Sequence, residues 1–234
     1  MPNGRFLIIL ACASFCSAQP AAPPKILLLA RQQFKSGKGP ARERLERATA
    51  AAYNKLDVPV YWMEMQAFTG SSEALFFDPF DSFEAVEKAG ATIGQLNEAH
   101  PELVRLQAGI DDSLSSSRTI LAVRRDSPGV NGIDLAQARF IRMLVVHAGP
   151  GDEQPSADLT PSIVYQVMSG MPGTAFLIFQ AMTAFTAIPA ARVTHGSVVE
   201  DIVYVVDPEL SHVSRAFAQQ GGAFWMKSPV GTKP

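Results

Sequence analysis

The sequence contains few of the residues that build covalent or metal-based sites. Its only two cysteines, Cys12 and Cys16, lie near the N-terminus, so the rest of the chain can form no disulfide and no thiolate metal site. None of its four histidines stands at the His-x-x-x-His spacing of a helical metal site. We therefore expect no bound metal and no cofactor.

The sequence also lacks a large net charge and the common motifs for nucleotide binding and nucleophilic catalysis. The formal net charge is −2 at pH 7, which gives no electrostatic reason to expect nucleic acid as a partner. The chain has neither a phosphate-binding glycine-rich loop with its lysine nor a Gly-x-Ser-x-Gly nucleophile motif. With 47% apolar and 18% charged residues, the composition is typical of a packed globular protein.

The N-terminal segment has the pattern of a secretory signal peptide. Arg5 is followed by an apolar run over residues 6–13 and by small residues up to Ala18, where cleavage is expected. The run is shorter than the roughly 20 residues that span a bilayer, so we expect no permanent membrane anchor. Lipidation at Cys12 is the alternative. The mature protein is expected in the periplasm or outside the cell.

Self-similarity is the strongest positive signal. Residues 76–83 match residues 205–212, because both are apolar strand ends that run into Asp-Pro. Residues 66–69 similarly match residues 180–183, and each half opens with an apolar run that ends in a Gly/Pro-rich turn. Four matches in the same order indicate a duplicated unit.

Each half is expected to follow the order β-α-β-β-α-β. In the first helix, leucines and alanines form an apolar face, and Arg42, Glu46 and their charged neighbours are assigned to the solvent side. The expected organisation is a signal peptide at 1–18, a linker at 19–24, a first repeat at 25–126 with an extra helix near 101–116, a linker at 127–138 and a second repeat at 139–234. The second repeat is expected to contain strands at 139–148, 174–185, 198–207 and 223–227, and helices at 157–169 and 208–220.

This duplicated element order resembles the dimeric α+β barrel superfamily, which includes antibiotic-biosynthesis-monooxygenase-like proteins. The resemblance implies an α+β fold in which two tandem ferredoxin-like repeats form a pseudo-dimeric α+β barrel. It also implies a ligand cavity in the barrel or between sheet and helices, and a barrel that can form a homo-oligomer through its outer helices. It does not specify the activity, because a fold hosts many functions.

The two-residue alternation of side chains along residues 59–69 predicts a strand with a candidate polar site on one face. Trp62, Glu64 and Gln66 share one face of this strand, and Gln180 is the repeat counterpart of Gln66. The two glutamines could line the barrel interior around a ligand, or satisfy each other as a structural pair.

Two ionisable residues are candidates for chemistry. A buried Glu64 would have a raised pKa suited to a general base; alternatively it forms a salt bridge with Arg31 or Arg142. His147 stands near the end of a strand, where a cavity could open, although a structural role is the simpler interpretation. The favoured function is an exported protein that binds a small apolar or aromatic molecule. The alternative is a cofactor-independent enzyme of the monooxygenase or isomerase type.

Overall fold

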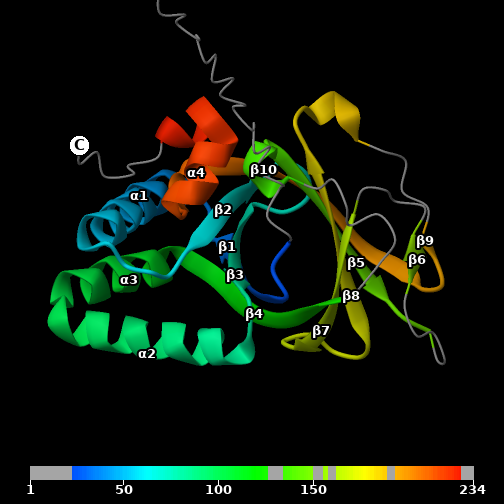
Figure 1. Cartoon of the computed structure of the whole chain (residues 1–234), viewed down its shortest axis with the longest axis horizontal. Coiled ribbons are helices and arrows are strands. Elements are labelled where there is room, and N and C mark those ends of the chain that lie inside the picture. Colours follow the sequence, from blue (N-terminus) through cyan, green and yellow to red (C-terminus); the bar gives the residue numbers. More distant parts are fainter. Residues whose placement is uncertain (1–22, 126–133, 150–154, 158–161, 189–192, 228–234) are drawn as a thin grey trace, which may run out of the picture.

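A closed antiparallel barrel of eight strands forms the centre of the protein (Figure 1). The computed structural model describes residues 23–125, 134–149, 155–157, 162–188 and 193–227. Around the barrel the strands follow the order β1-β3-β2-β10-β5-β8-β7-β4. The barrel strands are β1 (Ile26–Phe34), β2 (Trp62–Ala67), β3 (Glu73–Phe80), β4 (Leu114–Arg125), β5 (Phe140–His147), β7 (Ile163–Ser169), β8 (Ala175–Met182) and β10 (Ser197–His212).

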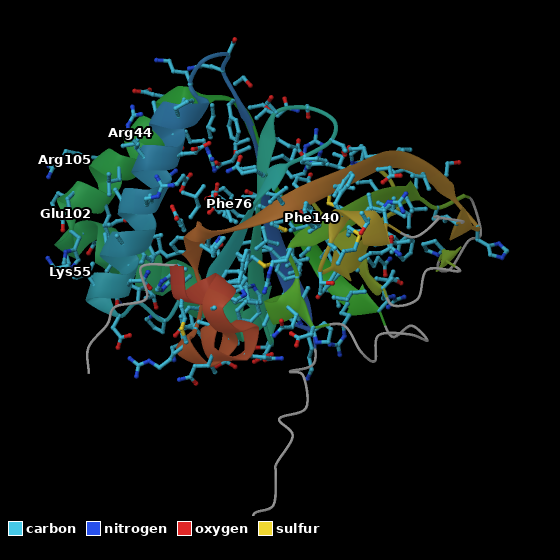
Figure 2. The ribbon with its side chains drawn as sticks, turned by 90° about the horizontal axis from the view of Figure 1, so that it is seen from above. Arg44, Lys55, Phe76, Glu102, Arg105 and Phe140 are labelled. Carbon is cyan, nitrogen blue, oxygen red and sulfur yellow. The ribbon has the colours of Figure 1, made fainter. Side chains whose placement is uncertain are left out.

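The helices of the first half cover one side of the barrel. Strands β4-β1-β3-β2 are neighbours in that order, and α1 (Gly39–Leu56), α2 (Phe83–Ala99) and α3 (Pro101–Ser113) pack on their outer face (Figure 1). Figure 2 shows charged side chains such as Arg44 and Arg105 on the outer sides of α1 and α3. None of the helices in the described residues is long and apolar enough to cross a membrane.

The second half keeps the strand order of the first, and within its described residues the only α-helix is α4 (Arg215–Gly221). Its strands β10-β5-β8-β7 repeat the order of the first half. The predicted helix at 157–169 is wrong, because β7 occupies Ile163–Ser169. Ile163, Val164 and Tyr165 are buried, and such β-branched and aromatic residues fit a pleated, packed surface better than a helix. The short strands β6 (Ser156–Ala157) and β9 (Val193–Thr194) pair with each other beside this half.

The C-terminal prediction also needs correction. Strand β10 continues to His212, so the predicted helix at 208–220 is reduced to α4 (Arg215–Gly221). The predicted strand at 223–227 is wrong, because Gly222–Lys227 forms a 3₁₀ helix. This turn buries Trp225 completely and lets its indole Nε1 donate to the carbonyl oxygen of Ala136 at 2.7 Å. Tertiary packing of one large side chain therefore decides the local structure.

The sequence matches that suggested the repeat fall on strands that are not equivalent. Gln66 lies on β2, whereas Gln180 lies on β8; the Asp78-Pro79 pair lies on β3, whereas Asp207-Pro208 lies on β10. The strand order instead places β2 opposite β7 and β3 opposite β8 around the barrel. The matched motifs are thus not repeat counterparts.

Apolar side chains fill the barrel interior. Alternate residues of every strand point inward and are buried, including Leu29, Met65, Phe77, Tyr165 and Phe179. The rings of Phe77 and Phe179 meet edge to face across the barrel, with centroids 5.6 Å apart. Sites for ligands must therefore be sought at the barrel ends or under the helices. We call the end of the barrel where β1 begins the lower end and the end where β1 finishes the upper end; these names follow the direction of β1 and not the orientation of Figure 1.

Candidate functional site

A pocket of about 350 Å³ opens at the lower end of the barrel. This volume lies within the range of small-molecule sites, roughly 300–1,000 Å³. Five aromatic side chains line it, together with prolines, aliphatic residues and a few polar groups. The aromatic residues are Tyr61, Trp62, Phe77, Phe80 and Phe217.

Several elements hold the walls of this lower-end pocket in place. Trp62 opens β2, and its indole Nε1 donates to the carbonyl oxygen of Leu210 at 2.9 Å. The hydroxyl of Tyr165 donates to the carbonyl oxygen of Pro24 at 2.9 Å, which ties the chain before β1 to the barrel. Ser214 caps α4 by accepting from the amide of Phe217 at 3.2 Å. The hydrogen bonds therefore preorganise an apolar wall from three separate parts of the chain.

A second group of polar side chains is buried between α1 and the outer face of β2. Arg42 of α1 is fully buried, and its Nη2 lies 2.7 Å from Oε1 of Glu64 and 3.4 Å from Oε1 of Glu46. Gln66 Nε2 donates to the same oxygen of Glu64 at 2.8 Å. The Arg42 guanidinium also lies 4.5 Å from the centroid of the Phe34 ring. We call Arg42, Glu46, Glu64 and Gln66 the α1 polar cluster.

The α1 polar cluster retains unsatisfied hydrogen-bonding capacity. Oε2 of Glu64 and both Nε and Nη1 of Arg42 are buried without a hydrogen-bond partner among the described residues. Nearby on β3, Phe76 lies between the sheet and the helices (Figure 2), and Oδ1 of Asp78 is likewise buried and unpartnered. Buried polar atoms normally find partners, so water or a bound polar molecule would complete these bonds.

Burial shifts the acidity of these carboxyl groups upward. The pKa of Glu64 is raised well above its usual value by burial and by the neighbouring Glu46, although Arg42 opposes the shift. Burial also raises the pKa of Glu46 to about 7, again against the attraction of Arg42. For Asp78, burial alone raises the pKa to about 7. The cluster can therefore hold or release a proton near neutral pH.

The upper end of the barrel carries an ion-pair network around a second, more polar pocket of about 280 Å³. The Arg31 guanidinium binds Glu73 at 3.0 Å and Glu200 at 2.7 Å. The Tyr204 hydroxyl donates to Glu73, and burial raises the pKa of this tyrosine. The buried charge of Glu73 is thus compensated from two sides, as a structural network requires.

The predicted site residues do not form one constellation. Trp62 lines the lower-end pocket, whereas Glu64 and Gln66 belong to the α1 polar cluster. Trp62, Glu64 and Gln66 do share a face, as predicted, but this face points outward to α1 and not into the barrel. Glu64 pairs with Arg42, so the predicted partners Arg31 and Arg142 are wrong.

The other two predicted residues lie elsewhere. Gln180 is buried on the outer face of β8, opposite Arg142 in register, so the predicted pairing of Gln66 with Gln180 inside the barrel is wrong. His147 ends β5, opposite Ala175 and Ser197, at the upper end of the barrel. It is therefore remote from Trp62. No group of acidic or histidine side chains in the described residues is arranged to hold a metal ion.

Arg42 and Glu46 are buried, although the apolar pattern of the helix predicted them on its solvent side. The buried residues of α1 are Arg42, Glu46, Ala50 and Tyr53, which follow the i, i+4, i+8 spacing of one helical face. The spacing places Arg42 and Glu46 on the same helical face as the apolar residues Ala50 and Tyr53. Because the first two are charged, their burial is not evident from an apolar pattern alone. Asp134 and Phe217 of the lower-end pocket were missed because only the fold brings them to β2.

The class of protein that this geometry defines is an α+β protein, as predicted, built around a closed antiparallel barrel of eight strands that all come from one chain. Similar solved structures include an anthrone oxidase-like protein with 12% identity and a TM-score of 0.49, covering 80% of this chain and 93% of the other. A candidate monooxygenase from Lactobacillus acidophilus has 7% identity and a TM-score of 0.44 over 79% and 93% of the two chains. A candidate chlorite dismutase has 12% identity and a TM-score of 0.46 over 79% and 95%.

No family model matches the sequence, and no curated protein matches it significantly.

Proposed function

We propose that this chain is exported and binds a small aromatic or apolar molecule in the lower-end pocket. The observation that carries the proposal is a preformed pocket of about 350 Å³ with five aromatic side chains in its wall. Such rings bury a large apolar area and favour offset or edge-on contacts with an aromatic ligand. The filled barrel interior leaves the ends of the barrel for a ligand, and of the two end pockets the lower one is the more apolar.

Export and duplication form part of the same proposal. Cleavage near Ala18 would release a mature chain that begins with the segment 19–24. Within that segment, Pro23 and Pro24 contribute to the pocket wall. The shared strand order of the two halves supports an origin by duplication of one ferredoxin-like unit, with 25–126 and 139–234 as the two copies.

Blocking the pocket tests the proposal. Leu135 is half-buried in the pocket wall, so Leu135→Trp should fill the space. We expect the affinity for the probe 2-phenylethanol, measured by ligand-observed NMR titration, to fall about tenfold or more. Native mass spectrometry before and after denaturation would reveal a co-purified ligand in the unmodified protein only.

The matched control is Val104→Trp, which adds the same ring at an exposed position of α3. It should leave binding unchanged. Equal affinity of the unmodified protein and Leu135→Trp, or no binding of any aromatic probe, would contradict the proposed function.

The α1 polar cluster favours a second candidate function, cofactor-independent proton transfer of the isomerase type. Glu64 has a raised pKa and an unpartnered oxygen beside the Arg42 guanidinium. Its carboxylate could accept a proton from an acidic C–H bond, while Arg42 would stabilise the anion that forms. A monooxygenase-type reaction would add molecular oxygen as co-substrate.

Deuterium exchange tests this second function. The protein should accelerate exchange at the acidic C–H groups of 2-tetralone in D₂O, followed by NMR, and Glu64→Gln should lower that rate by roughly 10²–10⁴-fold. Asp112→Asn, which neutralises an exposed carboxylate of α3, should retain the rate. Exchange no faster than in buffer, or equal rates for Glu64→Gln and the unmodified protein, would rule out Glu64 as the base.

A further inference from the structure

The lower-end pocket is acidic. Asp81 and Asp134 line it, and none of its lining residues is a lysine, an arginine or a histidine. Asp134 accepts hydrogen bonds through Oδ1 from the amide of Ala136 at 3.0 Å and from Nε2 of Gln220 at 3.2 Å. These neutral donors leave its negative charge uncompensated. Asp81 is exposed and stands just before the N-cap of α2.

Among the described residues, the cationic groups beside the pocket contact groups other than Asp81 and Asp134; Arg124, for example, donates to the carbonyl oxygen of Pro23 in the pocket wall. The Arg139 guanidinium lies 3.8 Å from the centroid of the Phe224 ring, and its Nη1 donates to the carbonyl oxygen of Ala138 at 3.0 Å. His212 packs against Tyr61 and Trp62 with ring centroids 5.3 Å and 5.2 Å away. Burial lowers the pKa of His212, and its two ring nitrogens are engaged by the side chain of Asn54 at 2.7 Å and by the carbonyl oxygen of Val58 at 2.9 Å.

The aromatic wall has the chemistry to receive a cation. Ring faces carry negative quadrupole density and attract an ammonium group within about 6 Å. Trp62, the strongest ring of this kind, is fixed by its hydrogen bond to Leu210 and by edge contact with Tyr53 at 5.0 Å. The pocket therefore combines fixed rings with two carboxylates, which is the combination that recognises organic ammonium ions.

We infer that the ligand of the lower-end pocket is an aromatic molecule that carries a protonated or quaternary amine. This inference rests on the proposed function and specifies the ligand class for the same pocket. The ring of the ligand packs against the apolar wall formed by Phe77, Phe80 and Phe217. Its ammonium group lies toward Asp81 and Asp134. A neutral ligand of the same shape gains only the first of these contacts, and a carboxylate is repelled.

Three probes of one shape separate the ligand class from binding itself. Phenethylamine, 2-phenylethanol and phenylacetate share the phenyl ring and differ in charge. By ligand-observed NMR titration at pH 7 and low salt, we expect phenethylamine to bind about tenfold more tightly than 2-phenylethanol. Phenylacetate should bind most weakly. Raising the salt concentration should lower the affinity for phenethylamine and leave the affinity for 2-phenylethanol nearly unchanged.

Two variants that each remove one negative charge, one in the pocket and one outside it, test whether the pocket carboxylates cause the preference for the amine. Asp81→Asn should reduce the affinity for phenethylamine about threefold to tenfold and leave that for 2-phenylethanol unchanged. Glu84→Gln is the matched control, because Glu84 is exposed in the first turn of α2 and does not line the pocket. Equal affinities for the three probes, or equal effects of the two variants, would overturn the inference while the proposed function stands. Failure of all probes to bind would overturn both.

Discussion

Replacing Arg42 by methionine is expected to destabilise the protein by about 3–5 kcal/mol at pH 8. The substitution keeps the apolar length of the side chain but removes the only cation that contacts Glu46 and Glu64 among the described residues. Both carboxyl groups are buried, and a buried carboxylate without a partner is strongly disfavoured. Chemical denaturation by urea at equilibrium measures the free energy of unfolding.

Arg47→Met is the matched control on the same helix. Arg47 pairs with Glu209 at 2.9 Å, but both side chains are close to half exposed, at 46% and 47%, so their removal should cost less than about 1 kcal/mol. At pH 5 the loss in Arg42→Met should shrink, because the carboxyl groups then accept protons. Equal losses in the two variants would show that Arg42 does not compensate buried charge.

Asp78→Asn is expected to stabilise the protein at pH 8 by at least about 2 kcal/mol and to have little effect at pH 4. Burial raises the pKa of Asp78 from 3.8 to about 7 in the folded state, so the folded protein binds this proton more tightly than the unfolded chain. Stability from the group is fully present below about pH 4 and is lost as the pH rises through about 7. Asparagine fills the same volume without the charge.

Urea denaturation between pH 4 and pH 8 tests this dependence. In the unmodified protein, Asp78 and Glu46, each with a pKa near 7, should make the free energy of unfolding fall over this range. Asp78→Asn should flatten the fall, whereas Asp112→Asn, at an exposed position of α3, should reproduce the unmodified profile. A profile for Asp78→Asn that parallels the unmodified protein would show that Asp78 is ionised in the fold.

The predictability of the elements differed between the halves for a physical reason. In the first half, the extra helix predicted near 101–116 is confirmed as α3, which begins at Pro101, a residue that favours the first turn of a helix. In the second half, the helix predicted at 157–169 follows from the element order of the first half, whereas the residues of Ile163–Ser169 themselves favour the strand that they form. The strand propensity of these residues is the better guide, and the helix predicted from the element order is wrong.

The candidate site shows the same division. Alternation placed Trp62, Glu64 and Gln66 on one face of a strand, because side chains of a strand alternate whatever surrounds it. Which face meets solvent, helix or barrel interior depends on closure of the sheet, and here that face meets α1. The partner of Glu64 could not be chosen from the sequence: Arg31 and Arg142 were the predicted alternatives, and only packing brings Arg42 to this carboxyl group.

By itself, the sequence determined the α+β class, the strands of the first half and their alternation, and the scarcity of groups for disulfide or metal chemistry. These depend on local propensity, periodicity and composition, which act over a few residues. Closure of the barrel, burial of Arg42 and Trp225, and assembly of the lower-end pocket from β2, β3 and α4 could be seen only in the folded protein. These depend on contacts between segments far apart in the chain, where the volume and charge of one side chain must fit those of another.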